Sequence, residues 1–381
     1  MQSKDSLRIF FLEKRKKLSR SDVLEKSRKI WERLRGLKEF LEARTVLFYY
    51  SIKNEVKTDF MIKEILGSKK VALPSIRGNS IVPLEVNDLE YMRKGKFGIP
   101  EPIGNEVPLD MIDIVIVPGI AFDFEGYRIG YGKGYYDNFL RKITCRKVGL
   151  AYDFQVVEEL PRGWCDVPVD IIVTEKRIIK CYEWRKEKEI LAEIKLLIDK
   201  YGVASKNDVE CSEEMLNNLA NKKLIKIEGD NLYLTDKGRK AIKIVLVGGC
   251  FNLLHPGHIL FLKEAKKLGD LLYVIVARDE EISKKGQPVI FNQRQRMQMI
   301  DAIKYVDLVI AGKEDKKEVI KRIKPDIIAI GYDQKITFNM DEELGKVRII
   351  RIKRKIDGLS TSKIIEKIKR EGNKGNLQKN Q

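Results

Sequence analysis

The chain has 381 residues, which is too long for one ordinary hydrophobic core and predicts two or three domains. Hydrophobic residues make up 43% and charged residues 34%, a balance typical of a soluble globular protein, and no apolar run approaches the length of a membrane span. The charged N-terminal sequence has no apolar signal core, so we expect a cytoplasmic protein. The five cysteines form no Cys-x-x-Cys pair, which argues against a zinc ribbon or a disulfide framework.

The formal net charge is +18 at pH 7, from 74 basic and 56 acidic residues. Two explanations stay open. A basic surface attracts polyanions such as nucleotides, folates or nucleic acid. Alternatively, surfaces rich in lysine and glutamate with dense ion pairs are common in proteins of heat-loving organisms. The basic residues are spread along the whole chain and do not mark one binding patch.

Residues 1–183 alternate helical and strand patterns, which predicts an α/β domain with mostly parallel strands. The stretch from Leu7 to Leu34 has the charged, amphipathic pattern of a helix. Short apolar segments predict buried strands at 45–51, 70–73, 112–117 and 147–151.

A glycine-rich segment follows the third of these strands. Gly126-Tyr-Arg-Ile-Gly-Tyr-Gly-Lys-Gly-Tyr-Tyr-Asp137 contains four glycines, a lysine, an arginine and a carboxylate. Alternating glycines let backbone N–H groups converge on an anion, and Arg128 and Lys133 supply positive charge. The spacing favours a phosphate-binding loop, with a tight structural turn as the alternative.

With Pro118-Gly-Ile-Ala-Phe-Asp123 before it, this segment resembles the 5-formyltetrahydrofolate cyclo-ligase family. The similarity continues, in the order of that family, at Lys4–Arg8, Glu55–Thr58, Phe97–Pro102, and Gln155 with Asp166–Asp170. The resemblance implies a three-layer α/β sandwich. It also implies ATP-dependent closure of 5-formyltetrahydrofolate to 5,10-methenyltetrahydrofolate.

The same resemblance implies roles for individual residues. Tyr50 would line the substrate pocket, Glu55 would hydrogen-bond the pterin, and Asp137 and Asp166 would hold Mg²⁺. Lys133 would also be catalytic. The implied ATP-binding residues are Lys4, Arg8, Arg128, Gly130, Gly132, Lys133, Gly134, Tyr135 and Tyr136. One departure is Tyr131, which stands where the family often has arginine.

Residues 184–240 have a different pattern. A predicted helix from Glu187 to Tyr201 precedes a second helix beginning at Ser212, and two alternating strands flank a Gly-Asp-Asn turn within 224–235. This order resembles a winged helix. The candidate recognition helix, 212–221, contains two glutamates and no Lys or Arg, although phosphate attraction needs cations. We therefore expect a spacer or interaction module, with DNA binding as the alternative.

Residues 241–371 return to an α/β pattern and contain both histidines of the chain, in His255-Pro-Gly-His258. Predicted strands cover 243–247 and 271–277, with a helix over 257–268. Proline at a first helical position leaves backbone N–H groups open, and such a helix start attracts phosphate. Gly248 and Gly249 let backbone approach an anion closely. The pattern predicts a phosphate site, with two ordinary turn histidines as the alternative.

The spacing His255-x-Gly-His258 after a glycine-ended strand resembles the cytidylyltransferase-type nucleotidyltransferase superfamily, which has a Rossmann-like fold. Later segments resemble it in the expected order: Lys285–Val289, Arg296, Tyr305–Asp307 and Gly358–Ile365. The implied reaction transfers a nucleoside monophosphate to a substrate phosphate and releases pyrophosphate, with Mg²⁺ on the nucleotide. The implied catalytic residues are His255, His258 and Arg296, and the implied nucleotide-binding residues are Cys250, Phe251, His255, His258, Asp333, Ser360, Thr361 and Ser362.

The acceptor of this transfer stays open. Residues 324–334 resemble archaeal FAD synthases, which transfer AMP from ATP to FMN. Cys250, however, stands where the superfamily usually has threonine, and residues 372–381, predicted to be a disordered tail, lack the cysteines that those enzymes carry near the C-terminus. Transfer of CMP from CTP to glycerol phosphate or another alcohol phosphate is the alternative.

Together, these patterns predict an α/β multidomain, bifunctional enzyme that acts on small molecules rather than on nucleic acid or membranes. The competing hypothesis is a regulator in which a DNA-binding middle block lies between domains that only sense folate or nucleotide.

Overall fold

The computed structural model describes residues 3–163, 165–313, 316–334, 347–356, 361 and 363–368. Two compact units divide the chain, Met1–Lys186 and Glu187–Gln381. The predicted third block, and the predicted middle block apart from residues 184–186, fall in the second unit. Ser360, Ser362 and the predicted disordered tail lie outside the described residues. Within the described ranges, no helix combines the length and apolar character needed to cross a bilayer.

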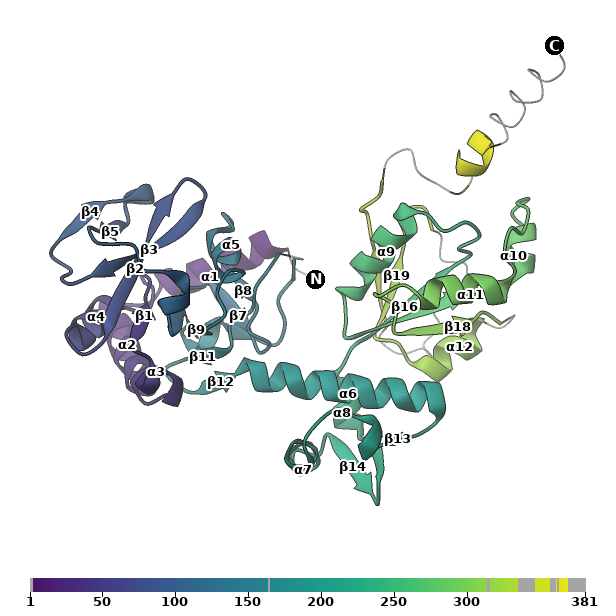
Figure 1. The fold of residues 1–381 in the computed structure, drawn as a ribbon, viewed down its shortest axis with the longest axis horizontal. Coiled ribbons are helices and arrows are strands. Elements are labelled where there is room, and N and C mark those ends of the chain that lie inside the picture. Colours follow the sequence, from purple (N-terminus) through teal and green to yellow (C-terminus); the bar gives the residue numbers. More distant parts are fainter. Residues whose placement is uncertain are drawn as a thin grey trace, which may run out of the picture. The chain divides into compact units, whose positions relative to one another are not determined.

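A seven-stranded sheet forms the centre of the first unit (Figure 1). Its order is β12-β11-β9-β6-β1-β2-β3; the five inner strands run parallel, and β12 and β3 are antiparallel edges. The strands are β1 (Thr45–Leu47), β2 (Lys70–Arg77), β3 (Ser80–Val86), β6 (Ile114–Val117), β9 (Arg146–Leu150), β11 (Ile171–Val173) and β12 (Ile178–Lys180). All four strands predicted from the sequence are present.

Helices cover both faces of this sheet and complete three layers (Figure 1). They are α2 (Arg20–Arg35), α3 (Lys38–Glu42), α4 (Asp59–Ile65) and α5 (Tyr135–Leu140), whereas Phe11 of α1 (Lys4–Lys16) packs in a separate core with Ala121 and Ile129. Ile30 of α2 and Met61 of α4 pack with Val46 of β1 in one core. Phe139 of α5 packs with Leu47 of β1 in another. Successive strand residues point to opposite faces, so the apolar run of β1 supplies both cores.

The single helix predicted from Leu7 to Leu34 is wrong, because the structure has two helices there. Ser19 begins the second as its N-cap: its Oγ accepts from the Asp22 N–H at 3.1 Å, and the Asp22 carboxylate accepts from the Ser19 N–H at 3.0 Å. This reciprocal capping box satisfies helix-start donors and favours a break at this point. The break lets α1 take a direction different from that of α2.

Smaller elements extend the first unit. Strands β7 (Ala121–Asp123), β8 (Arg128–Ile129) and β10 (Val156–Val157) form a three-stranded sheet, and β7 and β8 are an antiparallel hairpin. Strands β4 (Met92–Lys94) and β5 (Pro100–Pro102) pair separately. Short 3₁₀ helices lie at Lys96–Gly98, Leu109–Met111 and Asp153–Gln155.

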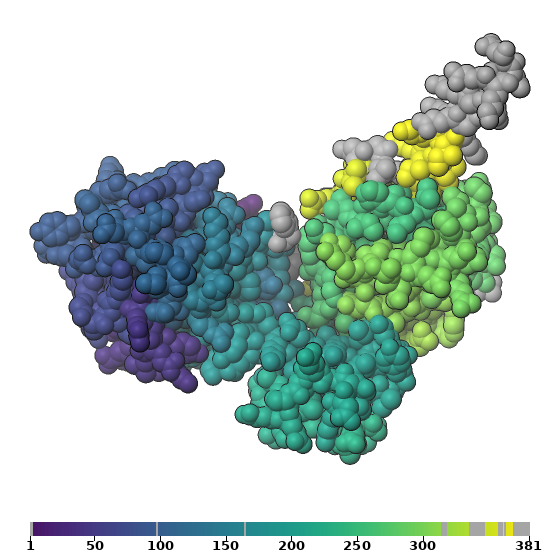
Figure 2. All heavy atoms as spheres, viewed as in Figure 1, coloured from purple at the N-terminus to yellow at the C-terminus, as the bar shows by residue number. Residues whose placement is uncertain are grey.

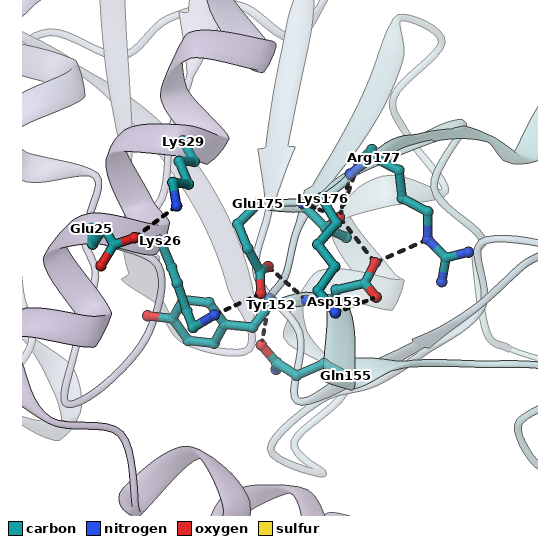
Figure 3. A network of polar contacts seen from close by, with 10 residues as sticks. Glu25, Lys26, Lys29, Tyr152, Asp153, Gln155, Glu175, Lys176 and Arg177 are labelled. Atoms are coloured by element: carbon teal, nitrogen blue, oxygen red, sulfur yellow. Dashed lines mark hydrogen bonds and ion pairs between the residues drawn. The ribbon is translucent and has the colours of Figure 1, made fainter.

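A network of hydrogen bonds and ion pairs connects α2 to the loops that follow β9 and β11 (Figure 3). The Lys26 ammonium lies 2.9 Å from Glu175 Oε1, and Glu175 Oε2 accepts from the Asp153 N–H at 2.8 Å. The Asp153 carboxylate accepts from Arg177 at 2.9 Å. Glu175 is buried, so removal of its partners would leave an uncompensated carboxylate and cost more than the loss of an exposed surface pair.

A five-stranded parallel sheet forms the centre of the second unit, in the order β18-β17-β16-β19-β20 (Figure 1). Its strands are β16 (Ile244–Gly249), β17 (Leu271–Val276), β18 (Leu308–Ala311), β19 (Ile327–Ile330) and β20 (Arg348–Arg351), and its helices are α9 (Pro256–Lys266), α10 (Asp279–Ser283), α11 (Gln293–Asp301) and α12 (Lys316–Ile323). The predicted strand–helix–strand around the histidines is confirmed. The order is that of a doubly wound, Rossmann-like sheet.

The middle block contains α6 (Cys181–Tyr201), β13 (Ala204–Ser205), a 3₁₀ turn (Lys206–Asp208), α7 (Glu213–Asn221), β14 (Ile225–Glu228), β15 (Asn231–Leu234) and α8 (Asp236–Ala241). Its strands form an antiparallel sheet, and α7 starts where predicted, with Ser212 as its N-cap. In Figure 2 its teal residues gather into a rounded lobe. Lys188 of α6 pairs with Asp270 at 3.0 Å, and Tyr273 of β17 donates to Asp199 of α6 at 2.6 Å. The winged-helix assignment stays a prediction.

Candidate active sites

The first candidate site lies where the strand order of the first unit reverses. The chain passes from β1 to β2 on one side and returns to β6 on the other side of β1. A reversal of this kind opens a crevice at the carboxyl ends of the two neighbouring strands. Tyr50 and Glu55 follow β1, and the glycine loop, residues 130–134, follows β6 through the β7–β8 hairpin.

The glycine loop has the backbone that its sequence predicts. Gly132 has φ +90° and Gly134 has φ +70°, a region that side-chain-bearing residues rarely adopt. Lys133 between them is exposed, and within the described residues its side chain has no hydrogen-bond or ion-pair partner. An exposed lysine ammonium between two glycines with positive φ is well placed to bind a phosphate group.

Helix α1 supplies two cations to this site, one to the loop and one to Asp166. Arg8 Nε donates to the Gly130 carbonyl at 2.8 Å, and a Cβ on Gly132 would lie 3.4 Å from the Arg8 guanidinium. The Lys4 ammonium pairs with the Asp166 carboxylate. The structure therefore brings Arg8 to the loop and Lys4 to the predicted metal ligand Asp166, each across more than a hundred residues of sequence.

Arg128, predicted to bind ATP, lies beneath the loop. Its side chain donates to the Val167 carbonyl at 2.6 Å and to Asp137 Oδ1 at 3.0 Å. Burial lowers the pKa of this guanidinium, and the nearby Asp137 and Asp166 carboxylates oppose that shift. With Nη1 and Nη2 engaged and only 7% of its surface exposed, Arg128 ties the strand before the loop to Val167 and Asp137, and its contact with ATP stays a prediction.

Asp137 and Asp166 could supply the one or two carboxylate ligands that a protein gives to a nucleotide-bound Mg²⁺ ion. Each has one oxygen engaged: Asp137 Oδ1 with Arg128 and the Val167 N–H, and Asp166 Oδ2 with Lys4 and the Gly163 N–H. The described residues contain no group of three or more His, Cys, Asp or Glu side chains that could hold a metal ion. Mg²⁺ commonly needs only one or two carboxylates when nucleotide phosphates and water complete its shell.

Glu55 belongs to a buried polar cluster that contacts the loop at Tyr131. Its Oε1 accepts from the Tyr131 hydroxyl at 2.8 Å and its Oε2 from the Ile52 N–H at 3.0 Å. Arg15 of α1 donates to the same hydroxyl at 2.6 Å. Burial raises the pKa of Glu55, and Arg15 opposes that shift.

The predicted tyrosines lie around this site. Tyr50 and Tyr136 pack against the hydrophobic core, and burial raises the pKa of Tyr136 well above its ordinary value. The Tyr135 hydroxyl contacts the Lys96 ammonium at 3.0 Å.

The second candidate site lies at the reversal of strand order between β16 and β19. A cavity of about 690 Å³ opens there. Its lining includes the predicted residues Cys250, Phe251, His255, His258, Asp333 and Thr361, together with Gly248 and Gly249. A volume of this order accommodates a nucleotide-sized ligand.

The two histidines stack on each other at this cavity. Their ring centroids lie 3.9 Å apart, and the angle between the two ring planes is 29°. His255 is the N-cap of α9, and its Nδ1 accepts from the Gly257 N–H at 3.1 Å, so the neutral ring carries its proton on Nε2. Burial and the nearby His255 lower the pKa of His258 to about 4, and burial lowers that of His255. Both rings are therefore neutral N–H donors near pH 7.

The glycines at the end of β16 have two separate functions. A Cβ on Gly248 would meet nothing within 4 Å, so this residue leaves open space beside the cavity. A Cβ on Gly249 would lie 2.7 Å from the Phe251 ring, whose edge contacts His258 at a centroid distance of 5.2 Å. Gly249 therefore permits the packing that holds Phe251 against the histidine.

Two family models match the chain. Residues 1–175 match the 5-formyltetrahydrofolate cyclo-ligase family, and residues 246–372 match the cytidylyltransferase-like family. An FAD synthase of Methanosarcina barkeri is 49% identical over 104 residues, which are 27% of this chain and 74% of that protein. An FAD synthase of Pyrococcus abyssi is 47% identical over 141 residues, covering 34% and 95%. This chain belongs to both families.

A solved structure also resembles the cyclo-ligase part. The 5,10-methenyltetrahydrofolate synthetase of Aquifex aeolicus is 42% identical, with a TM-score of 0.45, over 47% of this chain and 92% of that chain. The chain is thus a bifunctional enzyme that joins a cyclo-ligase domain to an FAD-synthase-like nucleotidyltransferase domain.

The structure does not bring Arg296 to the nucleotidyltransferase cavity. Its side chain is fully buried and donates to the carbonyls of Phe291 at 3.0 Å and Ala277 at 2.7 Å, to the Cys250 carbonyl, and to Asp279 at 2.5 Å. The predicted fixed charge at the nucleotide does not fit this geometry. Arg296 instead orders the backbone behind Cys250.

Several residues of the nucleotidyltransferase site escaped the sequence analysis. The cavity is also lined by the cations Arg278, Lys285, Lys313, Arg354 and Lys355. Only Glu281 and Asp333 contribute carboxylates among its described lining residues, so the cavity is positive overall. Lys285 begins a segment that the sequence analysis had matched to the superfamily, although without a role of its own; in a sequence with so many dispersed basic residues, nothing distinguished the other four.

Two amides shape the same cavity. Asn252 donates to the Pro288 carbonyl at 2.8 Å and accepts from the Ile290 N–H at 3.0 Å, which holds the loop after Lys285. Gln334 donates to the Gly248 carbonyl at 3.0 Å and thereby joins the ends of β19 and β16.

In the cyclo-ligase site, Arg15 was also missed. It lies seven residues after Arg8, on the same face of α1. That spacing was a usable signal, although Arg15 sits in a run of four basic residues.

Proposed function

We propose that the cyclo-ligase domain closes 5-formyltetrahydrofolate to 5,10-methenyltetrahydrofolate at the expense of ATP. We propose that the nucleotidyltransferase domain transfers AMP from ATP to FMN and releases pyrophosphate. The observation that carries the second assignment is the positive cavity of about 690 Å³ with both histidines on its wall. It lies in a domain of which 104 residues align with an FAD synthase at 49% identity.

In the first reaction, the formyl oxygen attacks the γ-phosphorus of ATP, and ADP leaves. The neighbouring nitrogen then attacks the activated carbon, and phosphate leaves with the former formyl oxygen. Phosphorylation is needed because a formamide oxygen is otherwise a poor leaving group. Lys133 would neutralise the γ-phosphate, and Glu55 would orient the pterin. Mg²⁺ held by Asp137 and Asp166 would screen the charge of the phosphates.

In the second reaction, a phosphate oxygen of FMN attacks the α-phosphorus of ATP, and the bond to pyrophosphate breaks. Such a transfer depends on positioning and on stabilising the developing negative charge. The Nε2–H of His255 and the ring of His258 would donate to phosphate oxygens. Lys285, Lys313 and Arg354 would neutralise the departing pyrophosphate.

The middle block is proposed to be a spacer or interaction module, because α7 offers no cation to a nucleic acid. Both proposed reactions consume ATP and act on cofactor precursors, and we propose the cytoplasm as their location.

Two assays on the purified full chain test these assignments. Addition of 5-formyltetrahydrofolate and Mg-ATP should produce the absorbance of the methenyl product. Pyrophosphate release should be greatest with ATP and FMN. No methenyl product at saturating Mg-ATP would reject the first assignment, and preference for CTP with glycerol 3-phosphate would replace the second with cytidylyl transfer.

Single substitutions should separate the two sites. Lys133→Ala should abolish folate cyclisation and leave nucleotidyl transfer unchanged, and His258→Ala should do the reverse. Loss of both activities in either variant would contradict independent sites.

A further inference from the structure

The Tyr131 hydroxyl lies between a buried arginine and a buried carboxylate. It accepts from Arg15 at 2.6 Å and donates to Glu55 Oε1 at 2.8 Å, whereas the direct Arg15–Glu55 separation is 3.7 Å. The side chains of Arg15 and Glu55 are 4% and 6% exposed, and Tyr131 is 43% exposed. The phenol thus closes a gap that the ion pair alone does not span at hydrogen-bond distance.

Tyr131 also belongs to the glycine loop. On one side of it, Gly130 accepts from Arg8 at 2.8 Å, and on the other, Gly132 lies over the Arg8 guanidinium. Arg8 and Arg15 share one face of α1. Helix α1 therefore holds the loop backbone with one arginine and the Tyr131 side chain with another.

We propose that Tyr131 is a positioning residue that links the nucleotide side of the cyclo-ligase site to its pterin side. This inference rests on the proposed cyclisation of 5-formyltetrahydrofolate. Glu55 Oε2 is fixed by the Ile52 N–H and Oε1 by Tyr131, so the hydrogen bond from the loop sets the orientation of the carboxylate. With the loop held by Arg8 and the carboxylate held by the loop, Glu55 would be presented to the pterin in one orientation.

The same contact acts on the charge of Glu55. Burial raises its pKa, while Arg15, the Ile52 N–H, Tyr131 and Lys57 oppose the shift. The other titratable groups near Glu55 are Tyr49, Tyr136 and Tyr152. A hydrogen bond to the ionised form lowers a carboxyl pKa, so removing the phenol hydroxyl raises the pKa of Glu55. The acidic limb of the pH profile must then move to higher pH.

Tyr131→Phe tests this role because it removes only the hydroxyl. The matched control is Tyr91→Phe, at a tyrosine that is 73% exposed and has no part in either site. The full chain is assayed for methenyl product as a function of 5-formyltetrahydrofolate, of ATP and of pH. For Tyr131→Phe we expect KM for the folate to rise about tenfold, as for a lost hydrogen bond to a charged group. KM for ATP should also rise, and the acidic limb of kcat/KM should shift upward.

The control variant should match the wild type in every parameter. The inference is refuted if Tyr131→Phe keeps the wild-type folate KM and acidic limb, or if only its ATP KM changes. Far-UV circular dichroism and thermal unfolding verify that both variants fold. An inactive wild type would instead refute the proposed cyclisation, and this inference with it.

Discussion

The stacked histidines make a direct physical prediction, because these are the only two imidazoles in 381 residues. Their ring C–H signals in a proton NMR spectrum can be followed without overlap and assigned with single-histidine variants. The pKa of His258 is lowered from its ordinary 6.5 to about 4, first by burial and then by His255. At about 1.4 kcal/mol per pKa unit, the site favours the neutral ring by about 3 kcal/mol.

His255→Asn is the informative perturbation. Asparagine is a good N-cap residue, so the start of α9 is retained while the neighbouring imidazole is removed. The pKa of His258 should rise because the repulsion disappears, yet stay below 6.5 because burial remains. Addition of ATP to the wild type should raise the pKa of both rings, since phosphate favours their protonated forms.

The lowered pKa of His258 makes the stability of the folded chain depend on pH. The unfolded chain binds a proton at His258 below pH 6.5, whereas the folded chain does so only near pH 4. The contribution of His258 to stability is therefore complete above pH 6.5 and is lost as the pH falls toward 4. Titration of His258 near 6.5 in the wild type would refute the buried, stacked geometry.

Other predictions concern packing and capping. Arg296→Met should lower the free energy of unfolding by about 3 kcal/mol, measured by denaturant titration, because Asp279 and the buried carbonyls lose their donor; an unchanged midpoint would contradict this. Gly249→Ala should lower the melting temperature, because its Cβ would meet the Phe251 ring at 2.7 Å, whereas Gly248→Ala should not. Ser19→Ala should cost about 1 kcal/mol through the lost capping box, and no change would mean that α2 begins without it.

Features that depend on neighbours in the sequence were predictable. The glycine loop has positive φ at Gly132 and Gly134, and its glycine-rich composition predicts such a backbone. The His255-Pro-Gly-His258 turn forms its cap and its stacking within four residues. Four strands of the first sheet and two of the second, β16 and β17, followed from apolar runs. The capping box at Ser19 outweighed the continuous amphipathic pattern around it.

Features that depend on the order of strands were decided by the tertiary structure. Tyr131 forms hydrogen bonds with Glu55, 76 residues away in the sequence, and with Arg15, 116 residues away. No local sequence pattern predicts such long-range contacts. Arg296 was predicted to contact the nucleotide, but it is buried and its side chain binds backbone carbonyls instead. The order of the strands brings Lys313 and Arg354 to one cavity. The sequence by itself determined which short segments can receive phosphate, because backbone conformation and capping are local. Folding alone decided which distant charges surround them, because long-range proximity is set by the sheet.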